Sequence, residues 1–167
     1  EGMASRAQDG QMKLATLVDG SRDGRLAIVS TDVRRARWAS GVAHTMQAAM
    51  DDWDSVRPAL ERASLVLNAD PDGDGTFDFE PAAALAPLPR AYAWLDGSAY
   101  LSHLHLFRKV QNRTVPDEYY RIPLMYQGGS DVLLSCRAPL PCTEGWGADC
   151  EGEVAVVIGD VPARPTR

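Results

Sequence analysis

The sequence has no apolar run near the roughly 20 residues needed to cross a bilayer, and its first residues lack the basic start and apolar centre of a signal peptide. We therefore expect a cytoplasmic protein with no membrane partner. Basic side chains are few and scattered, since 17 Lys and Arg are set against 23 Asp and Glu, a formal net charge of −6. Because phosphate binding needs cations clustered on one face, this balance argues against a nucleic-acid partner.

Paired cysteine motifs are also absent. Cys136, Cys142 and Cys150 form no CxxC pair, and their odd number leaves at least one thiol unpaired within the chain. A reducing compartment fits this pattern best. Ordinary buried thiols are favoured over a zinc site, because zinc sites of this kind are usually built from paired ligand knuckles.

The first half of the chain predicts a hairpin followed by helices. Residues 13–18 and 25–30 are short β-prone runs, and the sequence between them, 19–24, has the composition of a turn. Between residues 44 and 68 apolar side chains recur at helical spacing. Because proline disfavours a helix interior, we expect two helices that meet at Pro58 and cover one face of the sheet.

The second half differs from the first in composition and in the elements it predicts. Residues 70–89 are acidic and then rich in Pro and Ala, which predicts an irregular connection between two units. Residues 126–131 are expected to form a loop and 132–134 a short buried strand. The last predicted element is a core strand at 151–158, where an alternating start gives way to a continuous apolar run.

The stretch from Asp70 to Glu80 has much of the pattern of an EF-hand calcium loop. Aspartates stand at loop positions 1, 3, 5 and 9, and Gly75 falls at the sharp turn. The position that should supply a bidentate glutamate is Pro81, and the glutamate comes one place earlier. A solvated acidic turn is the simpler interpretation, and a calcium-binding module is kept as a third alternative for the function.

Glu151 and Glu153 form a second acidic feature. They stand two positions apart on the strand expected at 151–158, so both side chains would project from one face. Burying such a pair without compensation costs several kcal/mol or forces one carboxylate to take a proton. A bound cation is a natural partner for the pair, and a solvent-facing pair without a partner is the equally simple alternative.

Four separated segments resemble, in the same order, bacterial proteins of the fumarylacetoacetate hydrolase family. They are residues 89–92 (PRAY), 96–103 (DGSAYLSH), 123–131 (PLMYQGGSD) and 146–156 (WGADCEGEVAV). The hairpin region at 12–24 also resembles the start of that group. The resemblance covers nearly all of the chain from Met12 on, but not the acidic loop, which we interpret as a variable connection.

The resemblance implies an α+β protein. A small N-terminal sheet-plus-helices domain, residues 12–88, would precede the first part of a mainly β, mixed-sheet (β-roll-like) catalytic domain, residues 89–167, that is incomplete in this chain. Residues 1–11 are expected to be a flexible tail or a cloning remnant. In relatives further metal and substrate residues follow the Glu-x-Glu strand. The expected partner is therefore a second polypeptide or the missing C-terminal half, within a homodimer or hetero-oligomer.

The resemblance also implies a metal site. In the family an aspartate lies seven residues before a catalytic histidine, and Asp96 and His103 keep that interval. The family's Glu-x-Glu metal pair falls on Glu151 and Glu153. Asp96, Glu151 and Glu153 would then bind a divalent cation, Mg²⁺, Ca²⁺ or Mn²⁺, because such cations prefer carboxylate oxygens.

The implied substrate is a 1,3-dicarbonyl or acylpyruvate-type 2-oxo acid, of the kind met in the breakdown of aromatic compounds. The metal would stabilise the enolate formed when a carbon–carbon bond breaks, and His103 would act as the general base on water. Tyr126 would contact the substrate, Arg108 is a looser candidate for its carboxylate, and His105 has no assigned role. A decarboxylase or isomerase of the same family, or a non-catalytic binding subunit, stays open.

Overall fold

The computed structural model describes residues 11–129, 132–148, 150–161 and 163. The chain divides into two compact units, the first formed by 1–88 together with 134–167 and the second by 89–133. The tail expected at 1–11 lies outside the described residues except for its last position. The expected catalytic-domain assignment of 89–167 stays a prediction.

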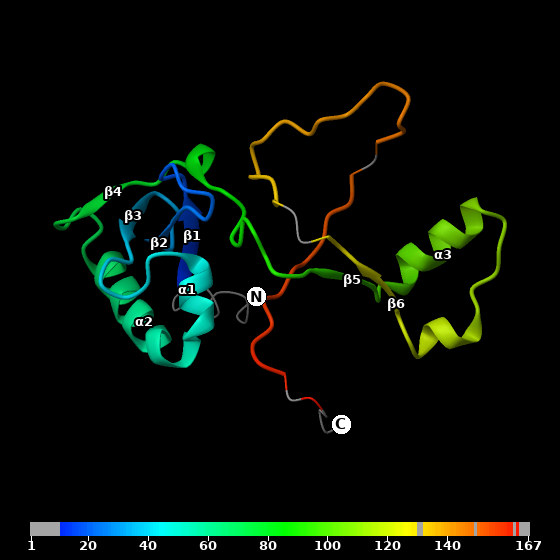
Figure 1. Ribbon diagram of the computed structural model, residues 1–167, viewed down its shortest axis with the longest axis horizontal. Coiled ribbons are helices and arrows are strands. Elements are labelled where there is room, and N and C mark those ends of the chain that lie inside the picture. The colour runs from blue at the N-terminus through cyan, green and yellow to red at the C-terminus, as the bar shows by residue number, and fades with distance from the viewer. Residues whose placement is uncertain (1–10, 130–131, 149, 162, 164–167) are drawn as a thin grey trace, which may run out of the picture. The chain divides into compact units, whose positions relative to one another are not determined.

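An antiparallel sheet of four strands, in the order β1-β2-β3-β4, is the centre of the first unit (Figure 1). The strands are β1 (Lys13–Leu17), β2 (Arg25–Val29), β3 (Arg35–Trp38) and β4 (Thr76–Asp78). The predicted hairpin is confirmed, with Lys13 opposite Val29 in β1 and β2. Its turn ends at Gly24, where φ is +63° and a Cβ would lie 2.6 Å from the Leu17 carbonyl oxygen. Only glycine fits this position without strain.

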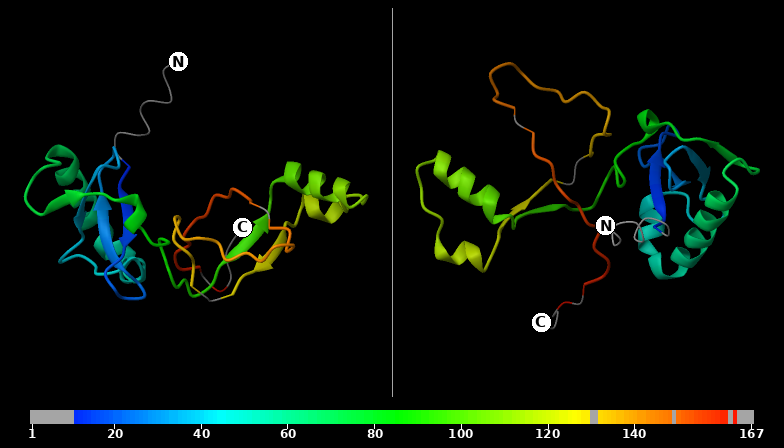
Figure 2. Two further views of the ribbon diagram at one scale, coloured as in Figure 1. Left: turned by 90° about the horizontal axis from the view of Figure 1, so that it is seen from above. Right: turned by 180° about the vertical axis from the view of Figure 1, so that it is seen from behind.

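Two helices cover one face of this sheet, as predicted (Figure 2). They are α1 (Met46–Asp51) and α2 (Trp53–Ala69). Thr45 caps α1, because its hydroxyl accepts a hydrogen bond from the Ala48 N–H at 3.0 Å. Leu26 and Ile28 of β2 pack against the helices in one buried cluster, which includes Met46, Ala49, Leu60 and Leu67.

The predicted junction between the helices is wrong. The break falls at Asp52, and Pro58 lies inside α2. A proline there removes a single N–H from the helical hydrogen-bond ladder. The fully buried Leu60 and Leu67 lie beyond the proline on the same helix, and their burial against the sheet stabilises the helix across it.

The opposite face of the sheet is also covered, so that β2 is buried on both sides. Ala27 and Val29 of β2 belong to a second buried cluster, against which Phe77 of β4 and the following Phe79 pack. The connection expected at 70–89 to be irregular is therefore partly ordered, with β4, a 3₁₀ turn at Pro81–Ala83 and a bridge from Ala84 to β1. These segments satisfy backbone groups that the sheet edges would otherwise leave open.

The second unit holds a two-stranded antiparallel sheet and two helical segments. The elements are β5 (Leu95–Ser98), α3 (Leu101–Val110), a 3₁₀ helix η2 (Asp117–Tyr120) and β6 (Leu124–Gln127). Apolar residues show no clean helical period over α3, and this helix was not predicted. The loop expected at 126–131 begins later than predicted, since Tyr126 and Gln127 belong to β6, and its last two positions lie outside the described residues.

Two predicted strands are wrong. Residues 132–134, expected to be buried, have no regular structure, and their side chains are exposed. Residues 151–158 are likewise exposed and irregular, with Val154 at 82% exposure. A strand is held by backbone hydrogen bonds to a neighbour, and none of the strands in the described part of the chain pairs with either segment.

The α+β class is confirmed, because small antiparallel sheets and helices build both the first unit and the second. None of the helices in the described residues has the length and apolar character that crossing a membrane requires.

Candidate functional site

Asp96 and Tyr126 are brought together by the strand pair of the second unit. They lie directly opposite each other in the register of β5 and β6. Residues opposed in this way have side chains on the same face, with Cβ atoms about 5 Å apart. Asp96 is half-buried and Tyr126 is exposed. One predicted metal ligand and one predicted substrate contact are therefore neighbours.

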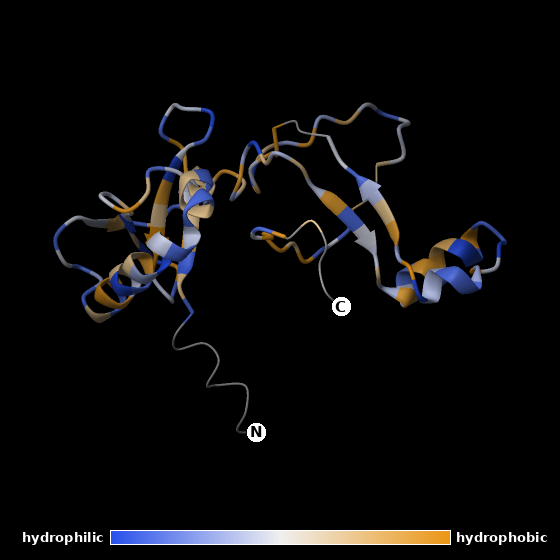
Figure 3. Ribbon diagram, turned by 60° about the horizontal axis from the view of Figure 1, so that its bottom comes forward, coloured by the Kyte–Doolittle hydropathy of each residue, from blue (hydrophilic) through white to orange (hydrophobic). Residues whose placement is uncertain are grey.

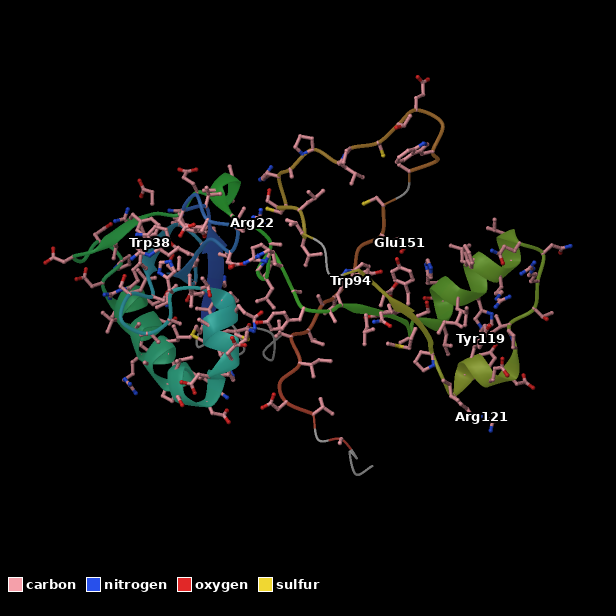
Figure 4. All side chains as sticks on the ribbon, viewed as in Figure 1. Arg22, Trp38, Trp94, Tyr119, Arg121 and Glu151 are labelled. Atoms are coloured by element: carbon pink, nitrogen blue, oxygen red, sulfur yellow. The ribbon has the colours of Figure 1, made fainter. Side chains whose placement is uncertain are left out.

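The ring of Trp94, which Figure 4 labels, packs against the ring of Tyr126. Their ring centroids are 5.5 Å apart, and the Gly128 N–H donates a hydrogen bond to the Trp94 carbonyl at 2.9 Å. A Cβ on Gly128 would lie 1.8 Å from the Trp94 indole, so this contact depends on glycine. The sequence reasoning missed the role of both residues. Gly128 and Gly129, close after Tyr126, were the available sign of a close contact at this point.

His103 lies on α3, which begins shortly after β5 ends. Its imidazole stacks on the Phe107 ring one turn later, with centroids 6.4 Å apart. His105 instead meets Tyr120, whose hydroxyl lies 3.1 Å from Nε2. Two residues along a helix correspond to a turn of about 200°. The two histidines therefore lie on nearly opposite sides of α3, in different surroundings.

Arg108 lies on the side of α3 that carries His105. It follows His103 by five residues, or about 140° around the helix. Its guanidinium carbon stands 5.2 Å from the centroid of the Tyr119 ring, which makes a cation–π contact. The sequence reasoning missed this partner. A role of Arg108 toward the substrate carboxylate stays a prediction.

The three expected metal ligands come from different parts of the chain. Asp96 belongs to β5 of the second unit, whereas Glu151, labelled in Figure 4, and Glu153 lie in exposed, irregular backbone assigned to the first. Three carboxylates suit a hard divalent cation by their chemistry. Among the described residues, no three His, Cys, Asp or Glu side chains gather closely enough to hold a metal. The ligand set stays a prediction.

Arg35 of β3 sits within the acidic loop of the first unit. Its guanidinium donates hydrogen bonds to the Pro71 carbonyl at 3.0 Å and to the Thr76 hydroxyl at 2.9 Å. It also forms an ion pair with Asp78 and lies 3.5 Å from an Asp72 oxygen. The positive charge of the Arg35 side chain thus neutralises part of the loop's negative charge. The sequence reasoning missed this contact, for which a basic cluster at 34–37 was the only signal.

The expected calcium-loop geometry appears only at its turn. Gly75 has a φ of +78°, the left-handed conformation that the sharp turn requires. The loop runs into β4, and beyond Glu80 there follows a short 3₁₀ turn in place of an exit helix. Calcium binding here stays a prediction.

Comparison with known protein families finds a match for the first part of the chain. Residues 12–90 match the family model described as Fumarylacetoacetase N-terminal domain 2. The four-stranded sheet and its two helices are therefore similar to a fumarylacetoacetase N-terminal domain. This confirms the family resemblance read from the sequence, and the matched segment contains the whole β1–β4 sheet with both of its helices. A comparison with curated proteins found no match.

The segment that matches the fumarylacetoacetase N-terminal domain does not contain the predicted site residues. Asp96, His103 and Tyr126 all follow the matched segment, as do Glu151 and Glu153. The family match therefore identifies the domain that precedes the candidate site. The roles of Asp96, His103 and Tyr126 rest on the motifs and on the geometry of the second unit, and those of Glu151 and Glu153 rest on the motif alone.

Proposed function

We propose that this chain contributes the first part of a metal-dependent hydrolase that cleaves a carbon–carbon bond in a 1,3-dicarbonyl or acylpyruvate-type 2-oxo acid. The observation that carries the proposal is the pairing of Asp96 with Tyr126 across β5 and β6, with His103 on the helix that follows. The fumarylacetoacetase N-terminal domain directly upstream supports it. These residues combine a cation ligand, a hydrogen-bond donor and a proton acceptor in one small unit.

Each residue has a separate task in this proposal. Asp96, Glu151 and Glu153 would hold a divalent cation, Mg²⁺, Ca²⁺ or Mn²⁺, which when bound supplies Lewis-acid polarisation of the substrate oxygens. His103 would accept a proton from water at an imidazole nitrogen. Tyr126 would donate its hydroxyl hydrogen to a substrate oxygen. Its place opposite Asp96 would put that donor beside the cation.

Activity would further require a covering partner. Among the described residues beyond Pro89, Leu104 alone is buried. Large apolar side chains such as Tyr100, at 72% exposure, and Val154, at 82%, lie open, and Figure 3 shows apolar segments along β5, β6 and α3. Exposed apolar surface of this extent marks an interaction site. A second polypeptide or a further segment, in a homodimer or hetero-oligomer, would bury it.

The test is an assay of the native assembly that contains this chain. Mass spectrometry first identifies any accompanying polypeptide, and hydrolysis of an acylpyruvate is then followed with and without Mg²⁺. We expect metal-dependent turnover that His103→Ala abolishes while substrate still binds. His44→Ala is the matched control, because His44 lies in the N-terminal domain near Asp19, and it should keep full turnover.

The outcomes separate the alternatives. Substrate binding without turnover in the wild-type assembly would contradict the hydrolase proposal and identify the chain as part of a non-catalytic binding subunit. Release of carbon dioxide, or a tautomer without cleavage, would identify a decarboxylase or isomerase. Full metal-dependent turnover in Glu151→Gln or Glu153→Gln would overturn the ligand assignment.

A further inference from the structure

A hollow of about 520 Å³ lies beside the C-terminal end of α3. Three cations line it, Arg108 and Lys109 from the last turn of the helix and Arg113 from the segment that follows. No residue in its lining is acidic, although the chain as a whole has a formal net charge of −6. The hollow is therefore a concentration of positive charge in an acidic protein.

The backbone brings these cations together by reversing direction. Asn112 adopts a left-handed conformation with a φ of +52°, which ends the helix. The Arg113 N–H then donates a hydrogen bond to the Arg108 carbonyl at 2.9 Å. This turn places Arg113 on the wall of the hollow with the cations of the helix. Like charges repel, so such an arrangement favours an anion between them.

Helix electrostatics account for only part of this cluster. Cations in the last turn interact favourably with the negative end of the helix dipole, which suffices to explain Arg108 and Lys109. Arg113 lies beyond the helix and gains nothing comparable. In the part of the chain that the structure describes, none of the three forms an ion pair with a carboxylate. Their charge is available to a ligand.

Further hydrogen-bonding groups complete the wall. Tyr120 and His105 line the hollow as a pair, with the tyrosine hydroxyl 3.1 Å from Nε2. The side chains of Asn112 and Thr114 add an amide and a hydroxyl. The Tyr119 ring packs against the Arg108 guanidinium, which limits the number of positions this cation can take. Several donors around one cationic centre suit an oxyanion.

We propose that this hollow binds a small oxyanion with two or more negative charges, such as a phosphate or a polycarboxylate. Because His105 lies about 200° around α3 from His103, the anion would bind on the side away from the candidate catalytic histidine. It is therefore a second site, separate from the one proposed for the substrate. The proposal reassigns Arg108 to this site.

The test is a titration of the 167-residue chain with inorganic phosphate or citrate at constant ionic strength, followed by ¹H–¹⁵N NMR against a sodium chloride reference. The amides of Arg108, Arg113 and Tyr120 should show saturable shifts with phosphate, citrate or both. The stronger probe distinguishes a phosphate from a polycarboxylate site. Arg113→Gln should weaken binding about ten-fold, as loss of one charge-assisted contact would. Lys109→Gln, which changes an exposed helix end, should act in the same direction.

Arg121→Gln is the matched control. Arg121 is an exposed arginine of the same unit, at the end of η2 and outside the hollow (Figure 4). It removes the same charge and should leave the affinity unchanged. Shifts that do not saturate, that chloride reproduces, or that Arg121→Gln reduces as much as Arg113→Gln would overturn the proposal. No step requires turnover, so the result does not depend on the proposed hydrolase activity.

Discussion

Asp96 and Tyr126 lie directly opposite each other across β5 and β6, although they come from segments far apart in the sequence. Their shared face depends on the register of this strand pair, which also places Gly97 opposite Met125. A shift by one residue would send one side chain to the other face. The interactions that fix the register therefore matter for any function of the pair.

Gly128→Ala should disturb this register through Trp94. The new Cβ would lie 1.8 Å from the indole, and Trp94 would have to leave its contact with Tyr126. We expect the Trp94 indole and Tyr126 amide signals to move in NMR spectra, with altered tryptophan fluorescence. Gly129→Ala is the control, because a Cβ there meets nothing within 4 Å. Equal spectra for the two variants would contradict the proposed contact.

Arg35→Gln should destabilise the N-terminal domain. The substitution removes an ion pair with Asp78 and hydrogen bonds to Pro71 and Thr76. Because the aspartates of the loop are mostly exposed, solvent screening limits the loss to about 1 kcal/mol in the free energy of unfolding. Urea denaturation measures it, and Arg34→Gln, which changes an exposed neighbour, should cost much less.

The same urea denaturation, with and without calcium, tests the calcium alternative. In the wild-type chain the Arg35 guanidinium already bonds to the loop, so added calcium should not raise the urea midpoint. A clear rise with millimolar calcium, abolished by Asp72→Ala together with Asp74→Ala, would establish the loop as a calcium site.

The turn between β2 and β3 gives a prediction for pH. The Ser30 hydroxyl donates to an Asp32 oxygen at 2.6 Å, and this bond, followed by one from the Arg34 N–H at 3.2 Å, lowers the pKa of Asp32. A lowered pKa stabilises the fold above the pKa of the unfolded chain, near 4, and this stabilisation is lost as the pH falls through the lower, folded value. Ser30→Ala should raise the pKa of Asp32 toward its ordinary range.

Carboxyl NMR shifts against pH measure this change. Asp19 serves as an internal control, because its pKa is lowered mainly by hydrogen bonds from Ser21 and should not respond to a change at Ser30. An unchanged Asp32 titration in Ser30→Ala would show that the serine hydroxyl does not set the pKa.

In the N-terminal domain, the composition of short runs and the spacing of apolar residues along the sequence were enough to predict the hairpin and the helices that cover the sheet. The hairpin followed from two β-prone runs around a turn, and the helical cover followed from apolar spacing between residues 44 and 68. The position of the helix break did not, because Pro58 is tolerated where buried side chains beyond it hold α2 to the sheet. β4 is a short strand that depends on its partner β3 more than on its own sequence.

In the candidate site, the sequence could supply residue types but not their neighbours. The spacing of Asp96 and His103 was visible, whereas the pairing of Asp96 with Tyr126 depends on a register that spacing cannot give. The strand predicted at 151–158 failed for a related reason. Its apolar run is typical of a core strand, but a strand forms only where another strand offers hydrogen bonds.

Limited proteolysis should separate the two halves of the chain. The N-terminal domain buries residues on both faces of its sheet, whereas Leu104 is the sole buried position among the described residues after Pro89. Cleavage by trypsin requires a locally opened backbone, so exposed sites such as Arg113, Arg121 and Arg137 should be cut first. Mass spectrometry should then find a persistent fragment from about residue 12 to the region of residue 90. Arg62, exposed but within α2 and followed by Ala63, is the matched site that should resist. Equally rapid cleavage at Arg62 and Arg113 would show that the N-terminal domain is not the more stable part.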